Sequence, residues 1–321
     1  MRYNVLVTSL SHKVPLVKNI RKALNRLTST GRVIGGDVDE KCIGRYFVDD
    51  FWLMPPISDL KIEELISNCK RYDISVIIPT RDGELLYFAE HKERLQAENI
   101  AVMISQAPNI KVCIDKLEFY NTLKNQSDFH VVPTSSNIDD LDATSYVAKE
   151  RFGAGARNIA LGVSRDKALE HARQLESPVF QPYIVGVEDS VDVYISMKGV
   201  VKGVIVRRRN VVVNGESQVT TTLHNEALER AAEALVTELG LRYHVVLQVL
   251  IDDSGVCHFI ECNCRFGGAS TLSVAAGLDS FYWFLLESKG EDVSNYPFYR
   301  SACELRQIRY PEGLIIDDPG F

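Results

Sequence analysis

A predicted β-hairpin within residues 244–270 is the part of the chain best suited to chemistry. Asp252-Asp253-Ser254-Gly255 is a turn sequence between two apolar stretches, so Ile251 should pair with Val256. Side chains two residues apart on a strand share a face. Four polar side chains should therefore project from one face of this hairpin: Gln248, Glu261, Asn263 and Arg265.

Two amides, a carboxylate and a guanidinium on one face form a suitable receptor for a magnesium ion and phosphates. Mg²⁺ prefers one or two protein oxygens together with phosphate oxygens. Arginine neutralises the charge that develops when a phosphoryl group is transferred. A polar outer face of an edge hairpin is the alternative interpretation, and residue types alone leave it open.

The same segment holds three cysteines, Cys257, Cys262 and Cys264. Strand alternation places Cys262 and Cys264 on the face opposite Glu261 and Asn263. No pair of them has the two-residue spacing that zinc sites prefer. We therefore expect buried structural thiols here rather than a metal site.

The run Glu261-Cys262-Asn263-Cys264-Arg265-Phe266-Gly267-Gly268 resembles the E-x-N-P-R-x-G-G signature of ATP-grasp enzymes. It is most similar to the short, single-module relatives of the carbamoyl-phosphate synthase large subunit. The resemblance extends from Val5 to about Glu287. Cys264 replaces the proline of the signature. The resemblance implies ATP and Mg²⁺ (or Mn²⁺) as cofactors, with Gln248, Glu261 and Asn263 as metal ligands.

Further residues match the phosphate-binding parts of that family. Lys116 opens a predicted helix, as the first lysine does, and Lys149 ends a strand like the one that carries the second. Gly153 and Gly155 resemble the glycine-rich loop that closes over the phosphates, where the family often has serine at the position of Ala156. Lysines supply point charges, and glycines let backbone N–H groups approach phosphate oxygens. Taken singly, each of these residues has an ordinary surface or loop explanation.

The nucleoside is implied to bind at a hinge after the second lysine. Gln181, Pro182, Tyr183 and Ile184 resemble the segment whose backbone reads adenine, and Glu188 resembles the glutamate that binds the ribose hydroxyls. The hinge usually has glutamate at the first of these positions. The amide oxygen of glutamine can still accept a hydrogen bond from the adenine amino group.

Three consecutive arginines follow, Arg207, Arg208 and Arg209. On a strand the first and third share a face, and the resemblance implies that Arg209 can hold the transferred phosphoryl group or the substrate carboxylate. A solvated cationic strand is the alternative. With Arg265 and Asn263, Arg209 completes the predicted catalytic set. The acid is expected near Arg265 and the loop that contains Gly267, Gly268 and Ser270.

The elements that position these residues predict an α/β and α+β fold. In the first hundred residues apolar strands alternate with helical patterns, among them a strand over residues 45–48 and a helix over residues 83–98, which indicates a parallel sheet. Another long helix is expected over residues 271–287. The resemblance divides the chain into a Rossmann-like domain (1–107), a small ATP-grasp lobe (108–184) and a large lobe (185–321). The first β–α turn contains no glycine, so the dinucleotide fingerprint is absent.

The composition is that of a soluble globular protein. The 321 residues are 45% hydrophobic and 25% charged, and the net charge of -7 argues against a nucleic-acid partner. No stretch of about 18 apolar residues could span a membrane. The odd number of scattered cysteines and the absence of a signal peptide predict a cytoplasmic protein. A homodimer is left open.

The function implied by the resemblance is an ATP-dependent carboxylate-amine ligase. A small-molecule acid, of which an amino acid is one example, would attack the γ-phosphate to form an acyl phosphate. An amine would then displace phosphate and form an amide. Two alternatives stay open on the same scaffold: a nucleotide-binding regulatory protein without catalysis, and a phosphotransferase that uses a hydroxyl acceptor.

Overall fold

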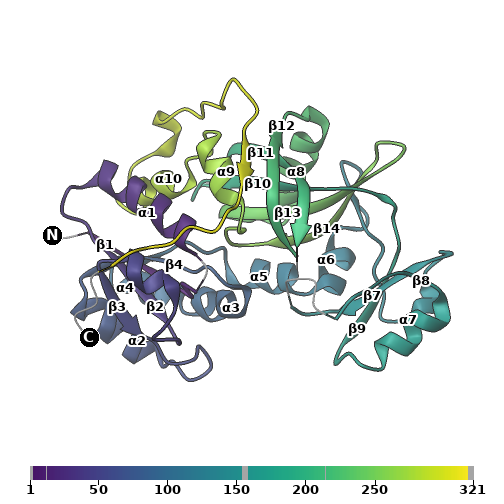
Figure 1. The fold of residues 1–321 in the computed structure, drawn as a ribbon, viewed down its shortest axis with the longest axis horizontal. Coiled ribbons are helices and arrows are strands. Elements are labelled where there is room, and N and C mark those ends of the chain that lie inside the picture. The colour runs from purple at the N-terminus through teal and green to yellow at the C-terminus, as the bar shows by residue number, and fades with distance from the viewer. Residues whose placement is uncertain (1–2, 12, 154–157, 214, 317–321) are drawn as a thin grey trace.

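The structure is a computed structural model and describes residues 3–11, 13–153, 158–213 and 215–316. The fold contains three β-sheets. One has five strands from the N-terminal part of the chain, one has three strands from the middle, and one has seven strands that come mostly from the C-terminal half. Figure 1 shows the first two sheets at opposite ends of the molecule, with the seven-stranded sheet between and above them. The predicted mixed α/β fold with an N-terminal parallel sheet is confirmed. None of the helices in these ranges is long and apolar enough to cross a membrane.

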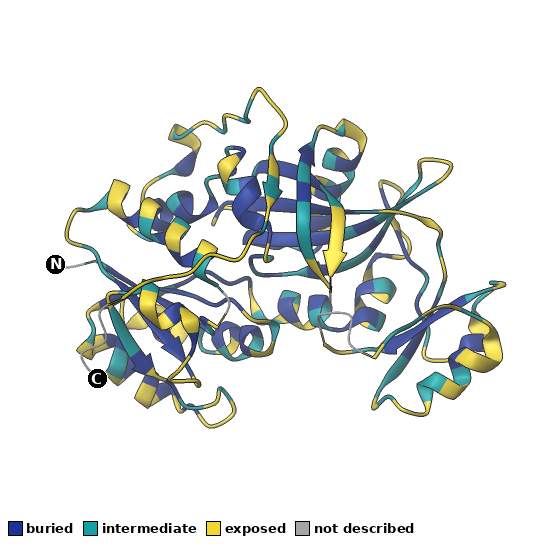
Figure 2. Cartoon of the chain, viewed as in Figure 1, coloured by how far each residue is buried: buried dark blue, intermediate teal, exposed yellow. Residues whose placement is uncertain are grey.

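The five-stranded sheet is parallel throughout, in the order β3-β2-β1-β4-β5. Its strands are β1 (Asn4–Thr8), β2 (Val33–Asp37), β3 (Asp50–Leu53), β4 (Ile74–Ile78) and β5 (Ala101–Val102). Its helices are α1 (Val14–Leu27), α2 (Ile62–Arg71), α3 (Asp82–Glu90) and α4 (Lys92–Ala97). The three central strands are buried along almost their whole length (Figure 2), as expected for a parallel sheet covered on both faces.

The strand predicted over residues 45–48 is wrong. The segment is instead a 3-10 helix, η1 (Ile43–Phe47), and the third strand follows it. The N–H of Gly44 donates to the Ser11 carbonyl at 3.3 Å. This bond holds the segment against the loop after β1, so it cannot pair with β2.

Two predicted long helices are each interrupted. The helix expected over residues 83–98 breaks at His91, whose Nδ1 lies 2.8 Å from the carbonyl four residues earlier. The helix expected over residues 271–287 breaks at Gly277, which has a φ of +109°; a Cβ there would lie 2.1 Å from the Tyr299 carbonyl. The resulting C-terminal helices are α9 (Ser270–Ala275) and α10 (Ser280–Glu287).

A buried glutamate, Glu84, lies at the carboxyl end of the parallel sheet. Strand β1 lies between β2 and β4, which is the point where open α/β sheets usually bind ligands. The buried Glu84 carboxylate accepts hydrogen bonds from Thr8 Oγ1 at 2.8 Å, Ser9 Oγ at 2.8 Å and the Thr80 N–H at 2.7 Å. Burial raises the pKa of the Glu84 carboxyl group, and the hydrogen bonds from Thr8, Thr80 and Ser9 oppose this shift.

The seven-stranded sheet has the order β15-β12-β11-β10-β13-β14-β6, and only β6 runs parallel to its neighbour. Its strands are β6 (His130–Val131), β10 (Gly186–Ile195), β11 (Val201–Val213), β12 (Glu216–Leu223), β13 (Tyr243–Asp252), β14 (Cys257–Asn263) and β15 (Arg306–Ile308). Helix α8 (Glu226–Glu238) packs against β10 and β11.

Alternation along β10 separates an apolar face of this sheet from a polar one. Val191 and Val193 are fully buried in the same core as Leu235 of α8. Ser190 and Asp192 point to the opposite face, because neighbouring residues of a strand alternate. Helix α8 therefore covers the apolar face, and the polar face is where the predicted ligands gather.

The three-stranded sheet, in the order β8-β7-β9, has a small core of its own. Its elements are β7 (Tyr146–Glu150), β8 (Ala160–Val163), α7 (Arg165–Ala172) and β9 (Pro178–Pro182). Helices α5 (Ala107–Ile114) and α6 (Lys116–Leu123) connect the N-terminal sheet to it and contact β14 on the way. The division of the chain at residues 107 and 184 stays a prediction.

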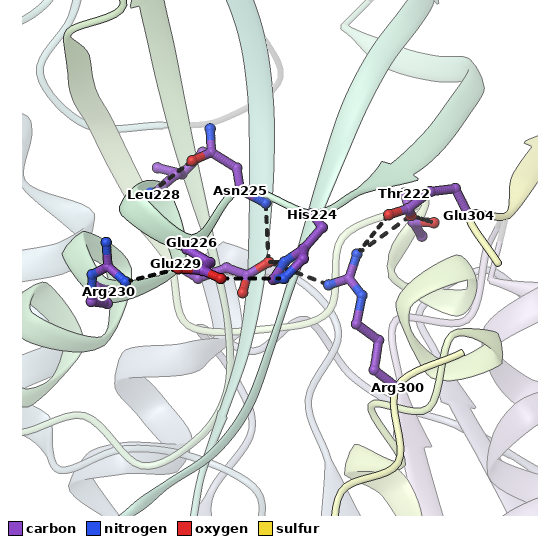
Figure 3. A network of polar contacts seen from close by, with 9 residues as sticks. All are labelled: Thr222, His224, Asn225, Glu226, Leu228, Glu229, Arg230, Arg300 and Glu304. Carbon is purple, nitrogen blue, oxygen red and sulfur yellow. Dashed lines mark hydrogen bonds and ion pairs between the residues drawn. The ribbon is translucent and has the colours of Figure 1, made fainter. Parts of the chain in front are cut away.

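A polar network attaches the C-terminal segment to the start of α8 (Figure 3). Arg300 Nη1 lies 3.3 Å from Glu229 Oε1, and Arg300 Nη2 lies 3.1 Å from Glu304 Oε1. His224 Nδ1 lies 2.9 Å from the same Glu229 carboxylate, and the Thr222 hydroxyl donates to Glu304. Through Glu229, these contacts link His224 to Arg300 of the C-terminal segment.

Candidate functional site

Four strands of the large sheet each contribute one side chain to a row across its polar face. Arg207 of β11 lies opposite Ser190 of β10. Ser190 lies opposite Gln248 of β13, which lies opposite Glu261 of β14. Residues directly opposite one another project from the same face of a sheet. The row therefore joins a cation at one end to a carboxylate and an amide at the other.

The hairpin that carries this row does not have the predicted register. Ile251 pairs with Cys257 rather than with the residue before it, and the register shifts by one after Gln248. Counting through the shift leaves Ile260 as the extra residue of a β-bulge. Because of the bulge, Glu261 lies directly opposite Gln248, so the two predicted metal ligands are cross-strand neighbours.

The polar side chains after Glu261 form a continuous chain of contacts. Asn263 Nδ2 donates to Glu261 Oε1 at 3.0 Å, and Arg265 Nη2 lies 3.3 Å from Asn263 Oδ1. Arg265 Nη2 also donates to Asp82 Oδ2 at 2.5 Å. Asp82 begins α3 of the N-terminal sheet, and the sequence prediction missed it. The contact ties the signature segment to the N-terminal region.

The arginines of β11 alternate between the faces of the sheet as predicted. Arg209 projects on the same face as the row, where its Nη1 donates to the Glu188 carboxylate. Its Nε donates to Ser217 Oγ at 3.1 Å, and its side chain is only 9% exposed. The ribose ligand and the clamp that the sequence predicts separately are therefore an ion pair in this structure.

The two predicted phosphate lysines are both buried. Lys116 Nζ donates to the Gly153 carbonyl at 2.8 Å. Burial lowers the pKa of Lys149 to about 8, a shift that the nearby Glu261 carboxylate opposes and the Lys116 ammonium increases. The structure thus brings both lysines within electrostatic reach of the row. Gly155, the second glycine of the predicted loop, lies outside the described residues, as does Ala156.

The predicted adenine hinge links β9 to β10. Gln181 is buried on β9, and its Nε2 donates to Thr134 Oγ1 at 2.8 Å. Pro182 ends the strand. Tyr183 and Ile184 then lie outside regular structure, in a position where backbone groups can serve a ligand.

Glu150, which stands where the family usually has proline, has a local structural role. Its two carboxylate oxygens accept hydrogen bonds from the N–H groups of Glu176 at 2.8 Å and Ser177 at 3.0 Å. These bonds hold the start of β9 beside β7. Glu150 therefore helps to position β7, the strand that carries Lys149.

The glycine-containing loop after Arg265 is held from two sides. The Gly267 N–H donates to Ser270 Oγ at 2.9 Å. Arg309, near the C-terminus, donates to the Gly268 carbonyl at 2.5 Å and to Glu216 Oε2 at 2.7 Å. The loop predicted to hold the acid therefore has a fixed shape and a second arginine beside it that sequence reasoning missed.

Lys13 is another missed residue of this region. It directly precedes α1, and burial lowers the pKa of its ammonium group, with the Arg265 guanidinium adding to the effect. The carboxylates of Glu216, Asp82 and Glu84 oppose this shift, so charges of both signs lie near Lys13. No local sequence signal could have found it, because Lys13 and Arg265 meet only in the folded chain.

A buried polar network supports the loop from below. Asp192 Oδ2 accepts hydrogen bonds from Arg207 Nε at 2.5 Å and Ser273 Oγ at 3.0 Å. His244 Nε2 lies 3.0 Å from Asp192 Oδ1, and its ring stacks on Phe266 with centroids 3.8 Å apart. These contacts connect Asp192, through His244, to Phe266 of the signature segment.

A small cavity of about 40 Å³ lies at the meeting point of these elements. Its walls include Asp82, Lys116, Gly153, Glu261 and Asn263. Residues that are up to 182 positions apart in the sequence (Asp82 and Cys264) therefore share one site. The cavity walls thus hold two carboxylates, an amide and an ammonium group. Such a set can bind a cation together with its partner anion.

Two family comparisons match this chain. Residues 5–103 match the family described as "PylC-like, N-terminal domain", and residues 174–310 match the family described as "ATP-grasp in the biosynthetic pathway with Ter operon". No curated protein matches the sequence.

Solved structures with the same fold include two nucleotide complexes. The biotin carboxylase domain of the 2-oxoglutarate carboxylase from Hydrogenobacter thermophilus, with MgADP and bicarbonate, has a TM-score of 0.75 and 16% identity over 94% of this chain and 73% of that chain. N5-carboxyaminoimidazole synthetase from Staphylococcus aureus, with ADP, has a TM-score of 0.71 and 17% identity over 91% and 79%. The match over residues 174–310 identifies an ATP-grasp region in this chain, and the likeness to the solved structures shows that the chain shares their fold.

Proposed function

We propose that this protein is an ATP-dependent carboxylate-amine ligase that forms an acyl phosphate and then an amide, releasing ADP and phosphate. The proposal rests on one observation. Side chains from three parts of the chain come together at one site: the two buried lysines Lys116 and Lys149, the oxygen-bearing Gln248, Glu261 and Asn263, and Arg265. This set suits phosphoryl transfer, which needs positioned charges and no side-chain nucleophile.

The nucleotide would bind between the three-stranded sheet and the polar face of the large sheet. Lys116 and Lys149 would contact its phosphates, together with Gly153 and Gly155 of the loop. The hinge of Gln181 to Ile184 would hold adenine and Glu188 the ribose. In this arrangement residues 108–184 and 185–321 act as the two lobes of the nucleotide site, and residues 1–107 form the domain beside it.

The side chains at the end of the row fit a magnesium ion. Gln248 and Glu261 present an amide and a carboxylate from adjacent positions of two strands, and Asn263 adds a second amide. Hard oxygen donors of this kind bind Mg²⁺ or Mn²⁺ and leave coordination positions for phosphate oxygens. When bound, the ion would neutralise charge on the β- and γ-phosphates.

The acid would lie near Arg265 and the loop of Gly267, Gly268 and Ser270. A guanidinium can hold a carboxylate through two hydrogen bonds while one oxygen attacks the γ-phosphate. Arg265 and Arg209 would stabilise the phosphoryl group as it moves. An amine then attacks the carbonyl carbon of the acyl phosphate, and phosphate leaves. Closure of the lobes would exclude water, which would otherwise hydrolyse the intermediate.

The solved relatives support a small acid and a magnesium nucleotide. One of them holds MgADP and bicarbonate in a dimeric domain, and another holds ADP. For this chain we propose small-molecule substrates, an acid and an amine, and we include a homodimer in the proposal. An amino acid is our first candidate for one substrate.

The test is ADP release by the purified protein with MgATP and a panel of acids and amines, offered singly and in pairs, with mass spectrometry of the products. A condensed mass that appears only with a pair is the expected result. A phosphorylated hydroxyl compound would replace the ligase by a phosphotransferase. Tight ATP binding without turnover for any pair would favour a regulatory protein.

A further inference from the structure

A second group of potential ligands lies beside the proposed magnesium site and takes no part in the proposed reaction. It consists of three free, buried cysteines: Cys113 on α5, Cys262 on β14, and Cys264 just after β14. Their three Sγ atoms all lie within 4.8 Å of one another. Cys262 lies opposite Leu247 in the sheet, on the α8 side, so it points away from Glu261 as strand alternation predicts.

The contact between α5 and β14 creates this cluster, which is why the sequence did not show it. Cys113 comes from a helix 149 positions before Cys262. The third thiol, Cys264, stands where the ATP-grasp signature has proline. Cys264, where this chain departs from the ATP-grasp signature, is thus the residue that completes the cluster of three cysteines.

The spacing of the sulfur atoms suits a single ion. A zinc–thiolate bond is about 2.3 Å long, so two thiolates on a tetrahedral zinc lie about 3.8 Å apart. An equilateral triangle with an edge of 4.8 Å has its centre about 2.8 Å from each corner. Side-chain shifts of about half an ångström would therefore bring all three sulfurs to bonding distance.

The cavity beside the three cysteines limits the charge and the coordination of an ion bound there. All three cysteines line the same 40 Å³ cavity as Lys116, which leaves room for a water molecule as a fourth ligand. Three thiolates and a divalent cation carry a net charge of about -1. At the cavity, the Lys116 ammonium opposes this charge and the Glu261 carboxylate adds to it, while Asp82 is paired with Arg265. A monovalent cation would leave twice that charge in a buried place.

We propose that Cys113, Cys262 and Cys264 form a binding site for one soft divalent cation of the zinc class, with a fourth position open to the cavity. Binding replaces three S–H protons by one cation and releases those protons to solvent, without any oxidation. Since thiolates select soft ions and the neighbouring oxygen ligands select hard ones, the two sites accept different metals.

The consequence is a link between a soft metal and the nucleotide site. Cys262 lies between Glu261 and Asn263 in the sequence, and Cys113 lies three residues before Lys116. An ion that joins the two segments would fix the distance between a phosphate lysine and the magnesium ligands.

The test is a titration of the full-length, metal-free protein with Cd²⁺ in the presence of a phosphine reductant. Cadmium bound to thiolates has an ultraviolet charge-transfer band, which oxygen ligands do not produce. We expect the band to saturate at one equivalent, and competition with Zn²⁺ to remove it. Cys113→Ser should weaken binding at least tenfold, and Cys264→Pro, which restores the residue of the signature, should do the same.

Two controls make the result decisive. Cys69→Ser removes a buried thiol on helix α2, outside the cluster, and should leave the titration unchanged. Glu261→Gln removes the carboxylate of the oxygen site and should leave the band intact. The proposal is overturned if the wild-type protein shows no band, or if Cys113→Ser retains the wild-type band and affinity. In either case the three cysteines only pack the core.

Discussion

Gln248 and Glu261 lie directly opposite each other on β13 and β14, because a bulge at Ile260 shifts the register of the hairpin by one residue. The pair presents an amide oxygen and a carboxylate from adjacent strands at one end of the polar row. Two oxygen donors in this arrangement can bind the same ion or two neighbouring ones. Glu261 is the only carboxylate of the pair and should contribute most to metal affinity.

The first prediction concerns this carboxylate. Glu261→Gln should lower the kcat of MgATP turnover by about 10²-fold or more, since metal-assisted charge stabilisation is lost. It should also raise the Mg²⁺ concentration needed for half-maximal rate. Asp253→Asn is the matched control, because it makes the same change at the exposed turn of the same hairpin. Wild-type kinetics in Glu261→Gln would show that the metal lies elsewhere.

A second prediction follows from the ion pair between Arg209 and Glu188. Glu188→Gln should raise the KM for ATP several-fold, and Arg209→Met should lower kcat as well. Because each side chain orients the other, the double variant should lose less activity than the product of the single losses. Steady-state kinetics of the four proteins measures this. Losses that multiply would mean that the two residues act independently.

The third prediction concerns Lys149, whose pKa burial lowers to about 8. Phosphates favour the charged lysine, so the bound protein holds this proton to higher pH than the free protein does. Affinity for metal-free ADP should therefore fall as pH rises above about 8, at most tenfold per pH unit. Calorimetry at several pH values tests this. Lys149→Met should remove the dependence, and Lys124→Met, at an exposed position, should retain it.

The buried network around Asp192 makes a prediction about stability. Burial alone would raise the pKa of Asp192, but the Arg207 guanidinium and the hydrogen bond with His244 hold it well below its usual range. Burial also lowers the pKa of His244. Both groups bind protons more readily in the unfolded chain. The free energy of unfolding should thus decrease as pH falls below about 6.5, and further below about 4.

Removal of the Asp192 charge should measure directly how much this network contributes to the free energy of unfolding. Asp192→Asn leaves the buried Arg207 without its partner, and we expect a loss of about 3–5 kcal/mol in the free energy of unfolding at pH 7. The decrease in stability below about pH 4 should also become smaller. Urea unfolding at a series of pH values gives both quantities. An unchanged pH profile in the variant would assign the acid sensitivity to other carboxylates.

The sequence predicted those site residues that belong to one continuous motif or to a strand with clear alternation. Glu261, Asn263 and Arg265 do share a connected site, and Arg207 and Arg209 do share a face. Alternation cannot show a single-residue bulge, so the register of the hairpin was wrong although the face was right. The break at Gly277 depends on a backbone carbonyl from a distant segment, which local helix propensity does not register.

Residues that reach the site from other parts of the fold could not be predicted. Asp82 and Lys13 come from the N-terminal sheet, and Cys113 comes from the helix that connects it to the middle of the chain. Nothing in the neighbouring sequence of any of them indicates a partner near residue 264. Such contacts follow from topology, which brings α5 beside β14 and α3 beside α5.

The most direct test of the proposed reaction is the fate of a carboxylate oxygen. The acid that supports turnover is labelled with ¹⁸O in its carboxylate, and the released phosphate is analysed by mass spectrometry. An acyl phosphate intermediate must transfer one labelled oxygen from the acid to each phosphate, and we predict this transfer. Unlabelled phosphate alongside a condensed product would mean that the acid never attacked the γ-phosphate, and the proposed ligase mechanism would be wrong.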